Sequence, residues 1–136
     1  MKEKKGFTLV ELLAVITLLS LVGLISVPIA INIIDKSKVK AYKQTLNGII
    51  DAAKIHNAEV DYQLFADGDI DLTEGKIQFE NLDKITEGYV SYSNKEYYLY
   101  DVTNDEFCAN GILGYYDIYR GSCDTGEVLD NSYSAR

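Results

Sequence analysis

The stretch FTLVELLAVITLLSLVGLISVPIAINII, Phe7–Ile34, decides the architecture of this chain. It carries a single charge, at Glu11, and the 23 residues from Leu12 to Ile34 carry none. A helix of that length rises roughly 35 Å, which matches a bilayer core of about 30 Å. The segment is therefore predicted to form a helix that can span a membrane.

A basic junction that ends in glycine lies directly before this segment. Lys-Lys-Gly at residues 4–6 is followed by Phe-Thr-Leu-Val-Glu at residues 7–11. The junction resembles the class III signal of the type IV prepilin family. This resemblance implies that residues 1–6 are a leader, and that a prepilin peptidase cleaves between Gly6 and Phe7 and methylates the new N-terminus at Phe7.

Three commoner kinds of apolar segment fit this stretch less well. A secretory signal peptide has a shorter apolar core and a small-x-small cleavage site, whereas this run is longer and Pro28 disrupts the nearest candidate site. An ordinary membrane anchor explains the length but not Glu11, because a carboxylate near the bilayer costs about 2.5 kcal/mol or more and tends to be functional. A buried helix of a soluble protein rarely runs this far without polar residues.

Length and charge limit the remaining possibilities. The chain has 136 residues, so about a hundred remain for a small soluble domain beyond the apolar helix. The formal net charge is −8, and the leader carries +2, so its removal leaves −10 on the side chains. This balance argues against nucleic-acid binding, because phosphate neutralisation needs clustered lysine and arginine.

The positive charges do not determine the orientation in a membrane. Lysines lie on both sides of the apolar segment, three within residues 2–5 and four within residues 36–43. The resemblance implies a cytoplasmic N-terminus, because the peptidase acts on that face of the membrane.

The only proline, Pro28, lies inside the apolar segment. It removes one backbone hydrogen bond and clashes with the preceding turn, so it is predicted to kink or weaken the helix. The resemblance implies that a proline 21 residues after Phe7 marks a part of the helix that can lose helicity when it packs into a filament. A tolerated transmembrane kink is the alternative.

From Asp35 onward the apolar residues become one-sided. They recur at alternating spacings of three and four, which predicts an amphipathic helix over residues 35–62 that continues the helix of residues 7–34. The only histidine, His56, falls on this apolar stripe, so we expect a core or interface residue rather than a metal ligand or a base. The stripe comprises Val39, Tyr42, Leu46, Ile49, Ala53, His56 and Val60.

Residues 66–75, ADGDIDLTEG, are predicted to form a solvated acidic loop. Asp67, Asp69 and Asp71 alternate as in a calcium-binding loop. The sixth position of that loop is Leu72 where the tight turn needs glycine, and the twelfth is Gln78 rather than glutamate. Calcium binding therefore remains an alternative, and no other cofactor is expected.

The globular part, residues 63–136, shows the patterns of β-strands. Ile77 and Phe79 alternate with polar residues, and the tyrosine- and valine-rich runs 89–93 and 97–102 flank a hairpin turn. Residues 115–119 add a third run. We expect an α+β fold in which a small antiparallel sheet of three or four strands packs one face on the apolar stripe of the helix.

Cys108 and Cys123 are the only cysteines, and both lie in the part predicted to be outside the cytoplasm. An oxidising compartment favours a disulfide between them, with two reduced cysteines as the alternative. Such a bridge resembles the C-terminal disulfide-bounded loop of many type IV pilins.

The function implied by the resemblance is structural. The sequence has no nucleophile motif, glycine-rich phosphate loop or metal-ligand cluster, so we expect no enzyme. The resemblance implies a pilin that enters the membrane as a prepilin and polymerises through its N-terminal helix into a cell-surface pilus for adhesion, twitching motility or aggregation. In the family, Glu11 would pair with the N-terminal amine of a neighbouring subunit. Implied partners are copies of itself, other pilins, the peptidase, an assembly ATPase and its platform protein.

Other roles remain open at this point. The chain could be a minor pilin or a type II secretion pseudopilin, although a pseudopilin more often has a calcium site and lacks the cysteine loop. A membrane-anchored extracellular binding module belongs to a different class. A DNA-binding competence pilin is disfavoured by the acidic charge.

Overall fold

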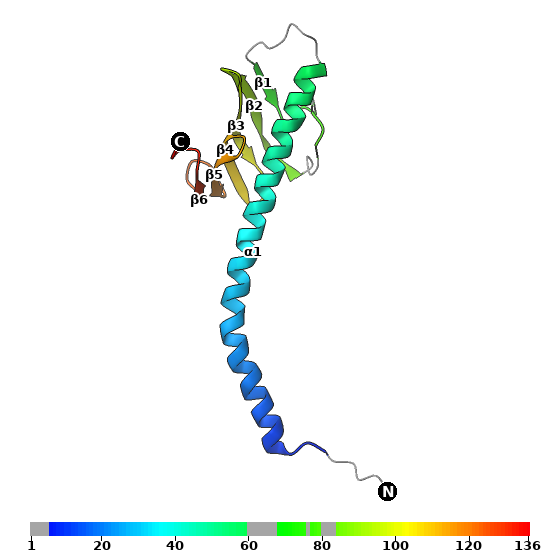
Figure 1. Ribbon diagram of the computed structural model, residues 1–136, viewed down its shortest axis with the longest axis vertical. Coiled ribbons are helices and arrows are strands. Elements are labelled where there is room, and N and C mark those ends of the chain that lie inside the picture. Colours follow the sequence, from blue (N-terminus) through cyan, green and yellow to red (C-terminus); the bar gives the residue numbers. More distant parts are fainter. Residues whose placement is uncertain (1–5, 60–67, 76, 80–83) are drawn as a thin grey trace. The chain divides into compact units, whose positions relative to one another are not determined.

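The computed structural model describes residues 6–59, 68–75, 77–79 and 84–136 (Figure 1). The chain divides into two compact units, residues 1–38 and 39–136. The expected α+β class is confirmed, with one long helix and a six-stranded antiparallel sheet. The elements are α1 (Leu9–Glu59), β1 (Gly68–Asp71), β2 (Glu87–Ser93), β3 (Glu96–Thr103), β4 (Phe107–Ile112), β5 (Tyr115–Arg120) and β6 (Glu127–Asn131).

The first unit contains the apolar part of α1. The helix continues through Pro28, and the predicted kink or weakening there stays a prediction. The hydroxyl groups of Thr17, Ser20 and Ser26 donate hydrogen bonds to backbone carbonyls three or four residues earlier. These few polar groups are therefore satisfied within the helix, as a segment surrounded by lipid requires.

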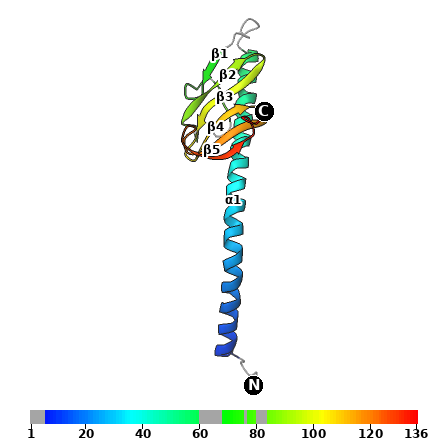
Figure 2. The same ribbon diagram turned by 90° about the vertical axis from the view of Figure 1, so that its left-hand side faces the viewer.

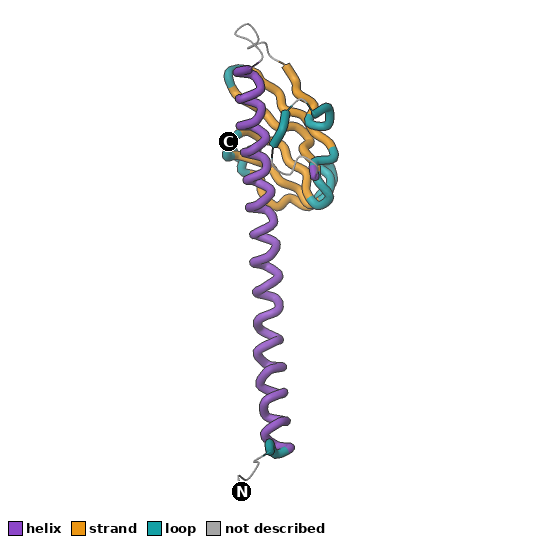
Figure 3. Tube along the Cα trace, turned by 90° about the vertical axis from the view of Figure 1, so that its right-hand side faces the viewer, coloured by secondary structure: helices purple, strands orange, loops and turns teal. Residues whose placement is uncertain are grey.

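The second unit consists of residues 39–59 of α1 and the sheet. The strand order β1-β2-β3-β4-β5-β6 makes the sheet an uninterrupted antiparallel meander. Figure 2 shows the sheet in front of α1, and Figure 3 shows the opposite side, where α1 covers the sheet. The sheet therefore has one face against the helix and one outer face.

The predicted apolar stripe of the helix forms the core together with the inner face of the sheet. Tyr42, Leu46, Ile49 and Ala53 are buried, which confirms this part of the prediction. Ile50 is fully buried as well, because the sheet covers more of the circumference of the helix than the predicted stripe occupies. The sheet contributes Val90, Leu99, Val102, Tyr116 and Ile118 to the same cluster.

The two ends of the predicted stripe are less buried or lie outside the described residues. Val39 and His56 are half-buried. The helix is described up to Glu59, so residues 60–62 of the predicted helix lie outside the described residues.

Two of the predicted strands are confirmed as a hairpin. β2 and β3 pair antiparallel, with Ser93 opposite Glu96. Asn94 and Lys95 between them have φ angles of 52° and 66°. Positive φ at both central residues is the geometry of a type I′ turn, whose twist matches that of the flanking strands. The run at residues 115–119 forms β5, as predicted.

The predicted number of strands is wrong, because the described residues form six strands rather than three or four. β4 was not predicted because both of its faces are buried, so its sequence FCANGI shows no alternation. β6 is a short, mostly polar edge strand. β1 lies within residues 66–75, so the predicted acidic loop is corrected there to an edge strand in which only Ile70 packs against the core.

Residues 77–79, the described part of the strand expected around Ile77 and Phe79, do not form a strand. This stretch is irregular, yet Ile77 is buried and Phe79 packs against the core. These two residues are apolar because the connection in which they lie covers part of the core. Alternation of apolar and polar residues over three positions is too short to distinguish such a connection from a strand.

Cys108 and Cys123 form a disulfide with their Cα atoms 5.2 Å apart. The bond ties β4 to the connection between β5 and β6, and the predicted pairing is confirmed.

Candidate functional site

The site is the N-terminal junction and the apolar helix that follows it. α1 begins at Leu9, directly after Thr8. The backbone N–H of Glu11 donates to Oγ1 of Thr8 at 3.2 Å, and the backbone N–H of Thr8 donates to Oε2 of Glu11 at 3.1 Å. This reciprocal pair is a capping box, which satisfies two donors that the first helical turn would otherwise leave without partners.

The capping box gives Glu11 a role that the sequence analysis missed. Thr-x-x-Glu directly before an apolar run is the sequence signature of this motif, and residues 8–11 match it. The carboxylate also lies at the positive end of the helix dipole, where a negative charge stabilises the helix.

Gly6 and Phe7 lie before the helix and are exposed. The Phe7 side chain is 83% exposed, and within residues 6–59, 68–75, 77–79 and 84–136 no group beyond the adjacent residue comes within 4 Å of the position that a Cβ atom at Gly6 would occupy. Residues 1–5 of the leader lie outside the described residues, and cleavage and methylation stay predictions.

The surface of α1 beyond the junction is apolar on every side. The large apolar side chains between Leu9 and Ile34 are 51% to 85% exposed. The helix is long and apolar enough to cross a membrane. Exposed apolar surface of this extent marks a segment that binds lipid or protein.

Besides the hydrogen bond from Nδ2 of Asn57 to the Tyr97 hydroxyl at 2.9 Å, three polar contacts fix the globular unit to its part of the helix. The Tyr42 hydroxyl donates to the carbonyl of Val102, and the Tyr116 hydroxyl donates to Oδ1 of Asn47. Burial raises the pKa of Tyr116 to about 12 and raises the pKa of Tyr42 further. Both phenols therefore stay neutral donors at physiological pH. The third contact joins Lys43 to Asp130 on β6.

Burial acts to raise the pKa of Asp130, and hydrogen bonds from Lys43 and Ser132 outweigh it. The net result is a pKa below the usual range for a carboxyl group. The Lys43–Asp130 ion pair is therefore intact near neutral pH and holds edge strand β6 to the helix.

The candidate calcium ligands are arranged along an edge strand. Asp69 and Asp71 lie on β1, while Asp67 lies outside the described residues. Oδ1 of Asp71 accepts hydrogen bonds from the backbone N–H and the hydroxyl of Thr73, at 2.8 and 2.6 Å. This carboxylate thus stabilises the turn after the strand, and calcium binding stays an alternative.

A second group of possible ligand atoms lies near the disulfide. Asp101, Cys108 and Cys123 bring such atoms within 4.8 Å of one another. Both sulfur atoms are consumed by the disulfide, and metal binding by cysteine requires the thiolate. This group is therefore no metal site in the oxidised protein.

Comparison with known proteins identifies the junction. The family model of the prokaryotic N-terminal methylation motif matches residues 1–27. No curated protein and no solved structure matches the chain. The matched region contains the Gly6–Phe7 junction, the capping box and the first turns of the apolar helix. The chain therefore carries at its N-terminus the methylation motif that is the class III signal peptide of type IV pilins, and this motif supports a protein of the type IV pilin or pseudopilin kind.

Proposed function

We propose that the mature chain, beginning at Phe7, is a structural subunit that polymerises through its N-terminal helix into a type IV filament outside the cell. The observation that carries this proposal is the apolar surface of α1 from Leu9 to Ile34, which the folded chain itself leaves exposed. Burial of one Leu or Ile side chain contributes about 1.5–3 kcal/mol. Lipid covers this surface before assembly, with the N-terminus in the cytoplasm, and neighbouring helices cover it in the filament.

Glu11 sets the position of each subunit along the filament. Its contact with the backbone N–H of Thr8 is a bond to a neutral donor, and this bond does not balance the negative charge. An unbalanced charge among packed apolar helices is costly. The amine of Phe7, exposed by cleavage and still positive after methylation, supplies the opposite charge from a neighbouring copy.

A pair of substitutions separates the charge of Glu11 from its capping role. Glutamine serves in a capping box as glutamate does, so Glu11→Gln keeps the helix start and removes the charge, while Glu11→Ala removes both. We expect both variants to be cleaved to the mature chain and both to fail to enter filaments. The measurements are the mass of the mature N-terminus and the amount of chain in filaments sheared from cells.

Normal filament yield from Glu11→Gln would refute the charge pairing, because only the capping role would then matter. A native chain that keeps residues 1–6 and stays dispersed in the membrane would refute the proposed function itself.

The implied partners are copies of this chain, other pilins, a prepilin peptidase, an assembly ATPase and its platform protein. We propose no catalytic role, and we propose that the filament serves adhesion, motility or aggregation. A pseudopilin is the second candidate. The Cys108–Cys123 disulfide favours a pilus, because pseudopilins more often rely on a calcium site. Abundant surface filaments that disappear when the gene is deleted would also exclude a monomeric anchored binding module.

A further inference from the structure

The connections between consecutive strands lie at two opposite edges of the sheet. These are the edges at which the strands begin and end, not the edges formed by β1 and β6. Because consecutive strands are antiparallel, the β1–β2, β3–β4 and β5–β6 connections lie at one edge, and the β2–β3 and β4–β5 turns lie at the other. Figure 2 shows these two edges on either side of the sheet. The two edges differ in charge.

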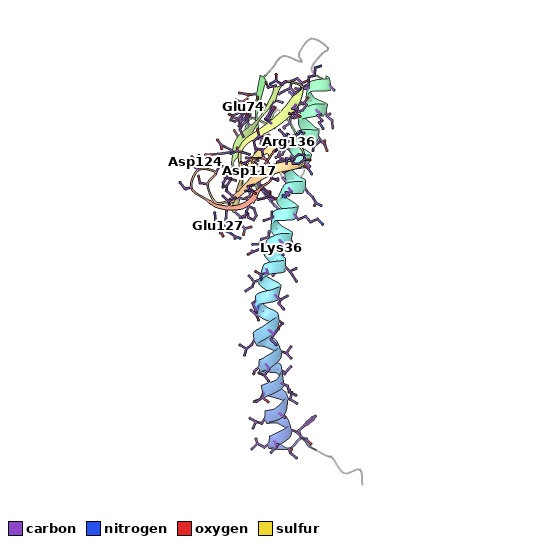
Figure 4. All side chains as sticks on the ribbon, turned by 60° about the vertical axis from the view of Figure 1, so that its left-hand side comes forward. Lys36, Glu74, Asp117, Asp124, Glu127 and Arg136 are labelled. Atoms are coloured by element: carbon purple, nitrogen blue, oxygen red, sulfur yellow. A yellow bond between two sulfur atoms is a disulfide. The ribbon has the colours of Figure 1, made fainter. Side chains whose placement is uncertain are left out.

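The edge with three connections is acidic. Within these connections and the strand ends beside them, the described basic side chains are Lys84 and Arg120, and Arg120 lies 3.6 Å from Glu127. Figure 4 shows Glu74, Asp124 and Glu127 along this edge. We call it the acidic edge; its exposed carboxylates are Glu74, Glu87, Asp105, Glu106, Asp124 and Glu127.

The opposite edge carries a basic hollow of about 320 Å³ beside the helix. Lys54 on α1, Lys95 in the β2–β3 turn and Arg136 at its rim are exposed, and Glu96 is the acidic residue of its lining. The guanidinium of Arg136 lies 4.8 Å from the centre of the Tyr115 ring and 3.9 Å from the Glu96 carboxylate. Figure 4 places Arg136 away from the labelled residues of the acidic edge.

The separation of acidic from basic side chains matters because the globular unit as a whole is strongly acidic. Residues 39–136 contain eighteen acidic and eight basic side chains, a net charge of −10. Copies of such a unit repel one another unless they meet through complementary surfaces. Three of the eight basic side chains line this hollow. Two of them lie beside carboxylates of the same chain, Lys54 at 3.6 Å from Asp51 and Arg136 at 3.9 Å from Glu96, whereas Lys95 is exposed in its turn. The hollow is therefore where a negative surface of another copy can approach.

We propose that the basic hollow of one copy receives the acidic edge of the next copy, chiefly through Asp105, Glu106 and Asp124. This inference rests on the proposed filament. Because the two surfaces differ and lie at opposite edges of one sheet, the contact is heterologous, and repeating it generates an open helical polymer rather than a closed dimer. Apolar residues in the hollow, including Ile50 and Ile112, lower the local dielectric and strengthen the pairing of the charges at the rim.

Zero-length cross-linking of native filaments tests the contact without a mutation. A carbodiimide couples a lysine amine to a carboxylate only where the two groups touch. We expect cross-linked dimers whose peptides join Lys54 or Lys95 to the β3–β4 or β5–β6 connection. Dimers that join these lysines only to other acidic segments would overturn the proposal.

Charge reversal gives an independent test. Lys54→Glu with Lys95→Glu places like charges at the contact and should reduce sheared filaments about tenfold. Asp105→Lys with Asp124→Lys should have a similar effect, and the chain with all four changes should recover most of the yield. Lys84→Glu is the matched control, because it alters the net charge in the same direction but on the acidic edge, and it should leave the yield unchanged.

The outcomes separate this contact from the filament itself. If the unmodified chain forms no filaments, the proposed function fails. If it forms filaments whose yield is unaffected by the reversals, or not restored by the four changes together, the contact is refuted while the filament stands. The level of oxidised mature chain in the membrane shows whether each variant has folded. If a variant has not folded, the cross-linking of unmodified filaments decides whether the proposed contact exists.

Discussion

The contact between helix and sheet should depend on Ile49 far more than on Ile55, although both are isoleucines of the same helix. Ile49 is fully buried, whereas Ile55 is 60% exposed. Both lie within residues 39–59, so replacement by alanine removes the same atoms from the same kind of backbone. The difference between the two variants therefore measures the packing of α1 on the sheet.

The expected magnitude follows from the atoms removed. Isoleucine to alanine deletes three carbons, worth about 2.4 kcal/mol at roughly 0.8 kcal/mol each. A cavity term adds to this where the neighbours cannot close the gap, so Ile49→Ala should cost about 2–5 kcal/mol. Ile55→Ala should change stability by less than about 0.5 kcal/mol, since alanine is the better helix former and little surface is lost.

The measurement is urea unfolding of the full chain in detergent, followed by the near-ultraviolet circular dichroism of the tyrosines. A domain of this size has a total free energy of unfolding of about 5–15 kcal/mol. The loss of stability in Ile49→Ala should therefore lower the urea concentration at the unfolding midpoint strongly, without changing the dependence of the unfolding free energy on urea concentration. Equal midpoints for Ile49→Ala and Ile55→Ala would refute the packing of this helix face on the sheet.

Three further predictions concern the globular unit. Reduction of the Cys108–Cys123 disulfide, which closes a separation of 15 residues, should cost about 3 kcal/mol in the chain-entropy model; an unchanged urea midpoint after reduction would contradict this. Burial raises the pKa of Tyr116 from 10.0 to about 12, so its contribution should be present below pH 10 and lost as the pH rises through 12. Tyr116→Phe should flatten the alkaline loss of stability, and an equally steep loss would contradict the burial effect. The pKa of Asp130 is lowered, so its contribution should be present above its ordinary value of 3.8 and disappear as the pH falls below it. The protection of the β6 amides against exchange, relative to their intrinsic rates at each pH, should then fall in acid. In Asp130→Asn, which cannot pair with Lys43 as an anion, this protection should be low already at neutral pH.

The sequence predicted those parts of the molecule that local pattern encodes. Uniform apolarity from Leu12 to Ile34 predicts a spanning helix without any tertiary information. The alternating spacing of Tyr42, Leu46, Ile49 and Ala53 predicts the buried helix face, because the helical period places these residues on one side. The β2–β3 hairpin was predictable as well, since its strands are rich in tyrosine and valine and flank a recognisable turn.

The elements that sequence reasoning missed depend on neighbours distant in the chain. β4 is buried on both faces, so no alternation signals it. β1 and β6 are polar edge strands that exist because β2 and β5 offer them backbone hydrogen bonds. The capping box at Thr8 and Glu11 is a different case, because its Thr-x-x-Glu signature is local and is present in residues 8–11.

The sequence by itself determined that the chain has a methylation-motif junction, a membrane-compatible helix and an acidic domain with two cysteines, because motifs, composition and short-range periodicity are local properties. Only the tertiary structure decided that Lys54, Lys95 and Arg136 gather at one hollow while the carboxylates of the acidic edge lie at the opposite edge of the same sheet. Charges spread over the chain from Lys54 to Arg136 meet at a single hollow because the meander reverses direction at every strand, and no local pattern carries that information.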